Sequence, residues 1–426
     1  MVKRMKISEC CISVSDGDHQ PPPKAKEGIP FITISNFTKD NTIDFSNTMF
    51  VPKNYFTELE DYRKVREGDI LYSVVGSFGQ PVYVDFCKPF VFQRHIAILR
   101  PNTDVVRGRF LYYSLMNPIF YRKADNLAVG AAQRTLTLTE LRNMEIDVPD
   151  IETQDRVIAV LNAIDEKIKN NTTINDNLQK QLKATFDYWF TQYNFPNEKN
   201  QPYKSSGGNM KYDDSIQHYV PATWETKSIG DTDIYVSDYT ANGSFKGLAD
   251  NVLYNQGDRY AMLIRVVDFN NNFDPKGDFV YVDKHGYDYL KKCHLHGGEI
   301  IICNVGNTGL TYRCPYLNIP MALGPNGIVV NLDSMNNYLY LHFQSEIGQF
   351  QLQAISSGSI QKKFNKTDFR DLRICFPPTD IVNKFNDIVN PIFSQINVIW
   401  EENRKLAGLR DWLLPMLMNG QASISD

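Results

Sequence analysis

Two glycine-containing loops carry side chains suited to recognising the edges of nucleic-acid bases. The first, residues 130–134, reads Gly-Ala-Ala-Gln-Arg, and the second, residues 358–363, reads Gly-Ser-Ile-Gln-Lys-Lys. Glutamine and arginine form paired hydrogen bonds with adenine and guanine, and lysine suits phosphate. Glycine lets a backbone approach a ligand closely. One such loop is more simply a solvated turn, but its recurrence 228 residues later favours a binding role.

The two loops belong to a longer internal repeat. The offset of 228 holds without a gap over residues 130–149, where six of 20 positions are identical. Upstream, Gly-Asp-Ile at 68–70 matches Gly-Glu-Ile at 298–300, at an offset of 230. A further pair of loops, 74–79 and 304–309, follows these strands. A period this long is not that of a solenoid and predicts a duplicated domain.

Polar loops elsewhere in the chain add candidate DNA contacts. Residues 16–19 precede a proline-rich stretch at 21–24, and Gln-Arg-His stands at 93–95, where the histidine is as readily a core residue. We expect DNA contacts from Asp18, His19, Lys24, Ser77, Arg94, Gln133, Arg134, Asn307, Ser359, Gln361, Lys362 and Lys363.

Two heptad patterns predict long helices. Apolar residues recur with alternating steps of four and three along 157–189 and 385–417. This spacing predicts a coiled coil, and two such helices of one chain most simply pair antiparallel. Asparagines in the seam would cost stability but set the register, and Pro391 should kink the second helix. The seam positions are Val157, Leu161, Ile164, Ile168, Leu178, Leu182, Trp189, Phe385, Val389, Ile392, Ile396, Leu406 and Leu413.

Length and composition indicate a folded chain of several domains. The chain has 426 residues, of which 42% are hydrophobic and 22% charged. At ~150 residues per domain this predicts two to three domains. The net charge of −4 argues against a protein that coats nucleic acid by bulk charge. We expect no membrane span and no secretory signal, and the seven cysteines lack disulfide-framework spacing, which suits a reducing cytoplasm.

The globular segments show mixed secondary structure. Helices are predicted at 110–120 and 338–353, and strands at 260–267, 299–304 and 327–331. A polar, turn-forming linker occupies 195–209. The order is therefore globular, helix, globular, helix, and the class is α+β.

Three near-motifs for catalysis or metal binding have simpler explanations. Asn-Pro-Ile-Phe at 117–120 resembles the Asn-Pro-Pro-aromatic loop of amino-methyltransferases, but it lacks the second proline and predicts a turn. Asp150 with Asp165 and Glu166 has a magnesium-nuclease spacing, but 165–166 lie in a heptad helix, where we expect solvated charges. The Cys-His-Leu-His run at 293–296 lacks the close ligand pairs of structural zinc sites. We expect no catalytic residue and no metal site on this chain.

The order of parts resembles the specificity subunits of type I restriction-modification systems. The resemblance is carried by Asp-Gly-Asp-His at 16–19, the linker at 195–208, Val-Pro-Ala-Thr-Trp-Glu at 220–225 and the ending at 413–420. It covers essentially the whole chain, but the target sequence does not transfer because members differ in their recognition domains. The resemblance implies an α+β fold in which two duplicated, mixed α/β target recognition domains are separated by two long antiparallel coiled-coil helices, with pseudo-twofold symmetry. The implied ranges are target recognition domains at 1–150 and 216–378, spacer helices at 151–190 and, with the C-terminal tail, at 379–426, and a linker at 191–215.

The resemblance also implies a function. A non-catalytic subunit would read a bipartite double-stranded DNA site, one domain per half-site, and direct two methyltransferase subunits and restriction/translocase subunits. The two helices, with the seam positions given above, would act both as the spacer and as the docking surface for these partners. S-adenosylmethionine, ATP and Mg would bind to those partners, and this chain would bind no cofactor. The complex would work in a bacterial or archaeal cytoplasm. Two alternatives remain open. The first is a single-chain DNA methyltransferase or nuclease, which binding of S-adenosylmethionine by the purified chain alone would favour. The second is a coiled-coil scaffold that does not bind DNA, which the absence of salt-dependent DNA binding would favour.

Overall fold

The computed structural model describes residues 2–17, 22–130, 133–273, 277–358, 361–422 and 424. Three of the expected DNA contacts, Asp18, His19 and Ser359, lie outside these residues. The chain forms two compact units, Met1–Ile168 with Leu406–Asp426 (unit 1) and Lys169–Lys405 (unit 2). Each unit therefore contains one globular part and a portion of both long helices. The domain boundaries expected from the sequence stay a prediction.

Unit 1 is built on a four-stranded antiparallel sheet in the order β2-β8-β5-β6. A three-stranded sheet, β4-β3-β7, and the pair β1-β9 complete its strands. The strands are β1 (Lys3–Lys6), β2 (Cys11–Asp16), β3 (Ile29–Ile32), β4 (Met49–Val51), β5 (Ile70–Ser73), β6 (Pro81–Tyr83), β7 (Val91–Phe92), β8 (Ile96–Pro101) and β9 (Glu145–Val148). The helices are α1 (Ile7–Cys10), α2 (Lys53–Glu58), α3 (Gly108–Met116), α4 (Pro118–Leu127) and α5 (Leu138–Asn143).

Unit 2 has a four-stranded antiparallel sheet of corresponding order, β13-β20-β17-β18, and a second sheet, β15-β14-β19-β16. The strands are β10 (Met210–Asp213), β11 (His218–Pro221), β12 (Glu225–Ser228), β13 (Tyr235–Asp238), β14 (Ala261–Ile264), β15 (Val280–Val282), β16 (His294–Leu295), β17 (Ile300–Cys303), β18 (Thr311–Arg313), β19 (Met321–Leu323), β20 (Gly327–Asn331) and β21 (Arg373–Phe376). The short helices are α7 (Phe245–Asn251), α8 (Val266–Asn270), α9 (Lys284–Tyr289), α10 (Asn336–Gln344), α11 (Glu346–Ala354) and α12 (Lys366–Arg370).

The repeated Gly-acid-Ile triplets have a structural role at the start of equivalent strands. The Asp69 carboxylate accepts the backbone N–H of Arg66 at 2.8 Å, just before β5. The Glu299 carboxylate accepts the N–H of His296 at 2.8 Å, just before β17. Each acid thus orders the turn that leads into the central strand of its sheet. Asp69 also forms an ion pair with Arg100 on the neighbouring strand, at 3.0 Å.

Two predicted helices are each divided in two, at positions that the repeat relates. The segment 110–120 breaks at Asn117, whose side chain accepts the N–H of Ile119 at 3.0 Å and caps α4. The segment 338–353 breaks at Ser345, which caps α11 through the N–H of Gly348 at 3.2 Å. Small polar side chains favour a helix start because they satisfy its free N–H groups. The expected strand at 260–267 likewise ends at Ile264, and α8 follows.

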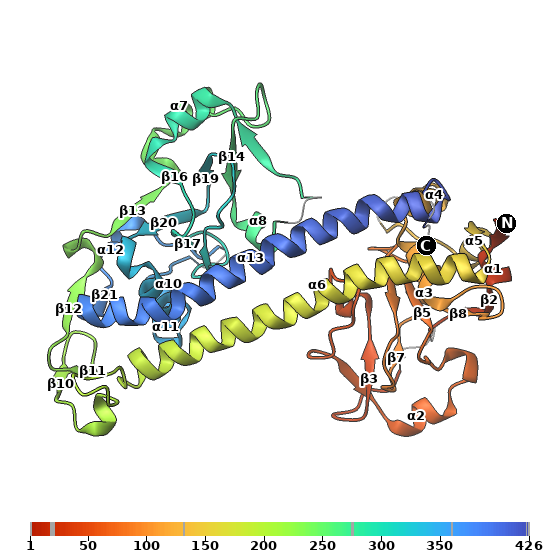
Figure 1. Ribbon diagram of the computed structural model, residues 1–426, viewed down its shortest axis with the longest axis horizontal. Coiled ribbons are helices and arrows are strands. Elements are labelled where there is room, and N and C mark those ends of the chain that lie inside the picture. The colour runs from red at the N-terminus through yellow and green to blue at the C-terminus, as the bar shows by residue number, and fades with distance from the viewer. Residues whose placement is uncertain are drawn as a thin grey trace. The chain divides into compact units, whose positions relative to one another are not determined.

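The long helices are α6 (Ile151–Phe186), continued by a π-helical turn at Asp187–Thr191, and α13 (Thr379–Met418) (Figure 1). α13 is continuous through Pro391, which is exposed and does not end it. The expected seam residues are turned inward. Eight of them are buried, namely Val157, Leu161, Ile164, Leu182, Trp189, Phe385, Val389 and Ile392, and five are half-buried, namely Ile168, Leu178, Ile396, Leu406 and Leu413.

Within each unit, α6 and α13 pair antiparallel. In unit 1, Val157 and Leu161 share a core with Leu414 and Leu417. In unit 2, Leu182 and Phe186 share a core with Phe385 and Val389, while Asn171 lies against Asn403 further along. As residue numbers increase along α6, those of the facing residues of α13 decrease, so the two helices run antiparallel. No helix in the described ranges is long and apolar enough to cross a bilayer.

Candidate nucleic-acid interface

In unit 1, the sheet brings separate loops to one end. β2 and β5 finish there, at Asp16 and Ser73, and their antiparallel neighbours β8 and β6 begin there, at Ile96 and Pro81. In an antiparallel pair one strand ends where its neighbour begins. The loops that connect these strands therefore lie together at this end of the sheet. We call residues 74–80, 93–95, 129–130 and 133–135 the first loop cluster.

Backbone hydrogen bonds hold the first loop cluster together. The N–H of Gly76 donates to the carbonyl of Arg134 at 2.8 Å, and the N–H of Val74 donates to the carbonyl of His95 at 2.9 Å. The Gln133 side chain is exposed, and its amide nitrogen lies 3.8 Å from where a Cβ on Gly76 would stand. The glutamine side chain therefore lies against Gly76 at ordinary van der Waals distance. Burial lowers the pKa of His95, with a further lowering from the neighbouring Arg94.

In unit 2, the same framework is built at the equivalent end of the sheet. The N–H of Gly306 donates to the carbonyl of Lys362 at 2.9 Å, and the N–H of Asn304 donates to the carbonyl of Asn326 at 3.2 Å. The amide nitrogen of Gln361 lies 3.7 Å from a Cβ position on Gly306. We call residues 304–310, 325–326, 357–358 and 361–363 the second loop cluster.

The backbone requires a glycine at the start of each glutamine-bearing loop, at Gly130 and Gly358. Gly130 has φ +98° and Gly358 has φ +110°, both in the region that L side chains rarely adopt. A Cβ at Gly130 would stand 2.4 Å from the carbonyl oxygen of Gln133, and one at Gly358 would stand 2.5 Å from that of Gln361. These glycines let each loop fold back on itself and present its glutamine outward.

Eight of the expected DNA contacts are exposed, namely Lys24, Ser77, Arg94, Gln133, Asn307, Gln361, Lys362 and Lys363. Two of the expected contacts make side-chain interactions within the chain. Arg134 forms an ion pair with Asp125 at 2.9 Å, and Lys362 donates to the Gln353 side chain at 3.2 Å. Sequence reasoning missed Asp125 and Gln353, although they stand at the same offset of 228 as the loops they contact.

The near-motifs have structural roles. Asn117 caps α4, as described above, and Asp150 accepts the N–H of Thr153 at 2.9 Å in the first turn of α6. That backbone hydrogen bond lowers the pKa of Asp150 to about 2. The expectation of solvated charges is wrong for Asp165, which accepts from Tyr113 Oη at 2.8 Å and pairs with Arg410 at 3.1 Å. The helix turns Asp165 toward α3 and α13, and spacing along one helix does not show this.

Cys293 and His294 of the possible zinc site each contact other parts of the protein. Cys293 Sγ contacts the carbonyl oxygens of Leu290 and Leu323 at 3.4 and 3.5 Å, and burial raises the pKa of its thiol to about 12. The His294 ring stacks on Tyr287 with 3.8 Å between centroids. Among the described residues no group of three or more His, Cys, Asp or Glu is arranged to hold a metal ion.

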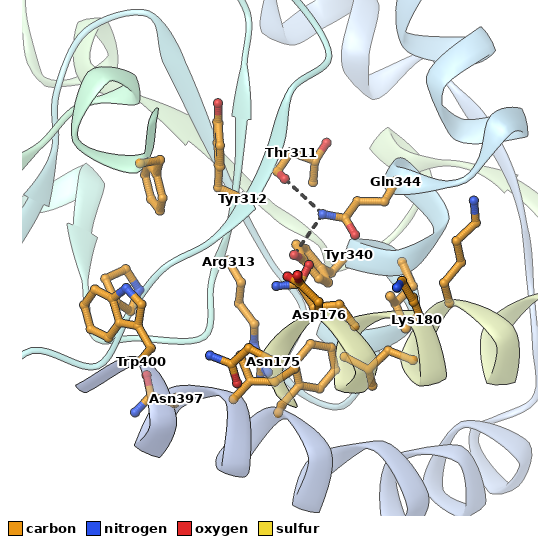
Figure 2. Close-up of a pocket in the computed structure, with 18 of the residues that line it drawn as sticks. Asn175, Asp176, Lys180, Thr311, Tyr312, Arg313, Tyr340, Gln344, Asn397 and Trp400 are labelled. Atoms are coloured by element: carbon orange, nitrogen blue, oxygen red, sulfur yellow. Dashed lines mark hydrogen bonds between the residues drawn. The ribbon is translucent and has the colours of Figure 1, made fainter. Parts of the chain in front are cut away.

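Unit 2 also contains a cavity of about 790 Å³ beside the long helices (Figure 2). Gln344 crosses it, donating to the Thr311 carbonyl at 3.3 Å and to Tyr340 Oη at 2.8 Å. The Arg313 guanidinium lies 4.0 Å from the Phe393 ring centre, and burial lowers the pKa of this arginine. Through such contacts, β18 is held against α13.

Comparisons with known proteins agree with this architecture. Residues 15–180 match the model of the type I restriction modification DNA specificity domain. The type I restriction enzyme HindI specificity subunit of Haemophilus influenzae is 22% identical over 414 residues, covering 84% of this chain and 87% of the relative. The MjaIX specificity subunit of Methanocaldococcus jannaschii is 23% identical over 353 residues, covering 81% and 76%.

A solved structure shares the fold. The crystal structure of the type I restriction-modification system S subunit from M. genitalium aligns with a TM-score of 0.57 at 14% identity, covering 100% of this chain and 97% of that one. The chain is therefore similar over most of its length to type I restriction-modification specificity subunits, and residues 15–180 match their DNA specificity domain.

Proposed function

We propose that this chain is the DNA-recognition subunit of a type I restriction-modification complex and reads a bipartite site, one loop cluster for each half. The observation that carries the proposal is the repeated framework. The carbonyls of Arg134 and Lys362 accept from Gly76 and Gly306 at 2.8 and 2.9 Å, and each loop presents a glutamine above its glycine. Two similar modules, duplicated at an offset of 228, would suit two half-sites. Glutamine pairs bidentately with adenine in the major groove.

The long helices would set the distance between the two modules. A bipartite site needs a fixed separation, and half-sites one helical turn apart lie ~34 Å from each other. The inferred arrangement is pseudo-twofold, with α6 and α13 as an antiparallel spacer between two target recognition domains. Because the seam residues face inward, partner subunits would contact other faces of the helices. Trp412 and Leu409 on α13 are exposed and belong to such a face.

Partner subunits would supply the chemistry. Two methyltransferase subunits would bind S-adenosylmethionine, and restriction/translocase subunits would bind ATP and Mg. This chain would carry no catalytic residue and no cofactor of its own, and the complex would work in a prokaryotic cytoplasm. The net charge of −4 agrees with shared DNA binding, since partners would provide part of the phosphate contact.

Two experiments in sequence test the proposal. Methylation mapping of host cells with and without this chain should reveal a split motif that depends on it. Binding of the assembled methyltransferase complex is then measured on oligonucleotides altered in one half-site at a time. Gln133→Ala should relax the preference for one half, and Gln361→Ala for the other, with ~1–3 kcal/mol of discrimination lost at the affected base.

The control is Gln201→Ala, an exposed linker position outside both loop clusters and both long helices, which should leave both preferences unchanged. Equal weakening on all sequences by either loop variant would contradict base reading and leave only phosphate contact. If deleting the chain removes no methylation motif from the host cells, the proposed function itself is contradicted.

A further inference from the structure

Each loop cluster holds a cationic side chain against a partner from the helix that packs beside it. In unit 1 the pair is Arg134 with Asp125 of α4, and in unit 2 it is Lys362 with Gln353 of α11. Both members of the second pair stand 228 residues after those of the first. The position is therefore the same, but its charge differs.

In the first loop cluster this cation, Arg134, is neutralised, whereas Arg94 of the same cluster is exposed. The Arg134 guanidinium lies 2.9 Å from the Asp125 carboxylate and also donates to the backbone carbonyl of Asp125. The arginine side chain is 42% exposed and the aspartate 47%, so both remain within reach of a ligand. A phosphate that approached Arg134 would also meet the negative charge of Asp125.

In the second loop cluster the cation is not neutralised. Lys362 Nζ donates to the neutral Gln353 amide at 3.2 Å, and Gln353 in turn donates to the carbonyl of Thr308 at 2.9 Å. Lys363 is adjacent and exposed. Within the described ranges neither lysine forms an ion pair, so two positive charges stand beside Gln361.

This difference matters because DNA affinity depends on released counterions. Each phosphate neutralised by a protein cation contributes about −0.9 to the slope of log affinity against log salt for duplex DNA. A cation already paired with a carboxylate contributes less, since its charge is compensated before DNA arrives. The residue at this helix position can therefore change the affinity of a module for the DNA phosphates without changing the residue that faces the bases.

We propose that residues 125 and 353 set an unequal phosphate contact in the two modules: Asp125 weakens it in the first by neutralising Arg134, and Gln353 leaves Lys362 free to make it in the second. Asp125 and Gln353 are positioning residues that act through the neighbouring cation. This inference rests on the proposed DNA-recognition function and deepens it.

The test exchanges the charges in the assembled methyltransferase complex. Asp125→Asn keeps the side-chain oxygen but removes its charge, and Gln353→Glu adds one at the equivalent position. Binding to the cognate duplex is measured from low to high salt. Asp125→Asn should steepen the slope by up to about 0.9 and tighten binding at low salt, and Gln353→Glu should flatten it by about as much. The double variant should return close to the starting slope.

Asp104→Asn is the matched control, because it removes the same charge from an exposed loop that follows β8, beyond the opposite end of the sheet. If Gln353→Glu lowers the melting temperature, Lys362→Gln replaces it and should flatten the slope by about 0.9. Equal slopes for Asp125→Asn and the unmodified complex would overturn the inference, as would an equal change in the control. If the inference fails but Gln133→Ala and Gln361→Ala still affect separate half-sites, the proposed DNA-recognition function stands. If no variant shows a half-site effect, the function fails as well.

Discussion

The side-chain amide of Asn171 donates to the side-chain oxygen of Asn403 at 2.9 Å, inside the seam between α6 and α13. Asn171 is 2% exposed and also donates to Glu402 at 2.7 Å. A buried asparagine in an apolar seam costs stability unless its partner is in register. This contact therefore defines the pairing of the two helices within unit 2.

Replacing Asn171 alone should destabilise unit 2 more than replacing both asparagines. Asn171→Leu removes the hydrogen bonds to Asn403 and Glu402, which should lower the free energy of unfolding by about 1–3 kcal/mol. The double variant Asn171→Leu/Asn403→Leu removes both polar groups of the pair and should recover the part of this loss that comes from Asn403. Urea denaturation of the single and double variants measures the coupling. Strictly additive effects would show that the two side chains do not depend on each other.

Lengthening both helices by one heptad should lengthen the preferred spacer in the DNA site. Seven residues inserted after Leu178 in α6 and at the facing turn of α13 preserve the seam and add about 10 Å at ~1.5 Å per residue, or roughly three base pairs. Methylation mapping of cells that carry the variant reads out the spacer. An insertion in α6 alone should disrupt the Asn171–Asn403 register and abolish assembly. A functional complex with unchanged spacing in both cases would refute the spacer role.

A methyl group on either loop glycine should impair one half-site only. Gly130→Ala and Gly358→Ala would each place a Cβ about 2.4–2.5 Å from a carbonyl oxygen in the same loop, at a positive φ. We expect a strain of ~1–3 kcal/mol and displacement of the neighbouring glutamine. Gly207→Ala is the control, because Gly207 has φ +86° but nothing within 4 Å of its Cβ position. Half-site binding should fall in the two loop variants and not in the control. Normal recognition by Gly130→Ala would mean that the loop shape does not matter.

The start of α6 should lose stability in acid through Asp150. The hydrogen bond from the Thr153 N–H lowers the pKa of Asp150 to about 2, below the value of 3.8 for an unperturbed aspartate. The ionised cap therefore contributes its full stabilisation above about pH 4 and loses it as the pH falls toward 2. Melting temperatures of the unmodified chain and Asp150→Ala should differ at neutral pH and converge between about pH 4 and 2. A constant difference across this range would contradict a role for the charge.

The heptad patterns predicted the two long helices because the helix period is a local feature of the chain. The seam positions were predicted from steps of four and three, and the structure buries or half-buries every one of them. The two predicted helices that proved to be divided break at Asn117 and Ser345, again 228 residues apart. Their helix-capping side chains and Pro118 were readable signals that the apolar pattern obscured.

Side-chain partners could not be predicted in the same way. Asp165 was expected to be solvated, but it lies between Tyr113 of α3 and Arg410 of α13, which are distant in sequence. Asp125 and Gln353 contact the two loop clusters from neighbouring helices, and no motif marks them. Such pairs depend on which helix faces which loop, and that is known only after the sheet and helices have packed.

The sequence by itself determined the period of 228, the two glutamine-bearing loops and the two heptad helices, because these are patterns along the chain. Only the tertiary structure decided that the loops meet their glycine-containing neighbours at one end of each sheet, and that Arg134 is paired with a carboxylate while Lys362 is not. Antiparallel pairing brings distant chain segments to the same edge, and the charge next to a side chain depends on that pairing.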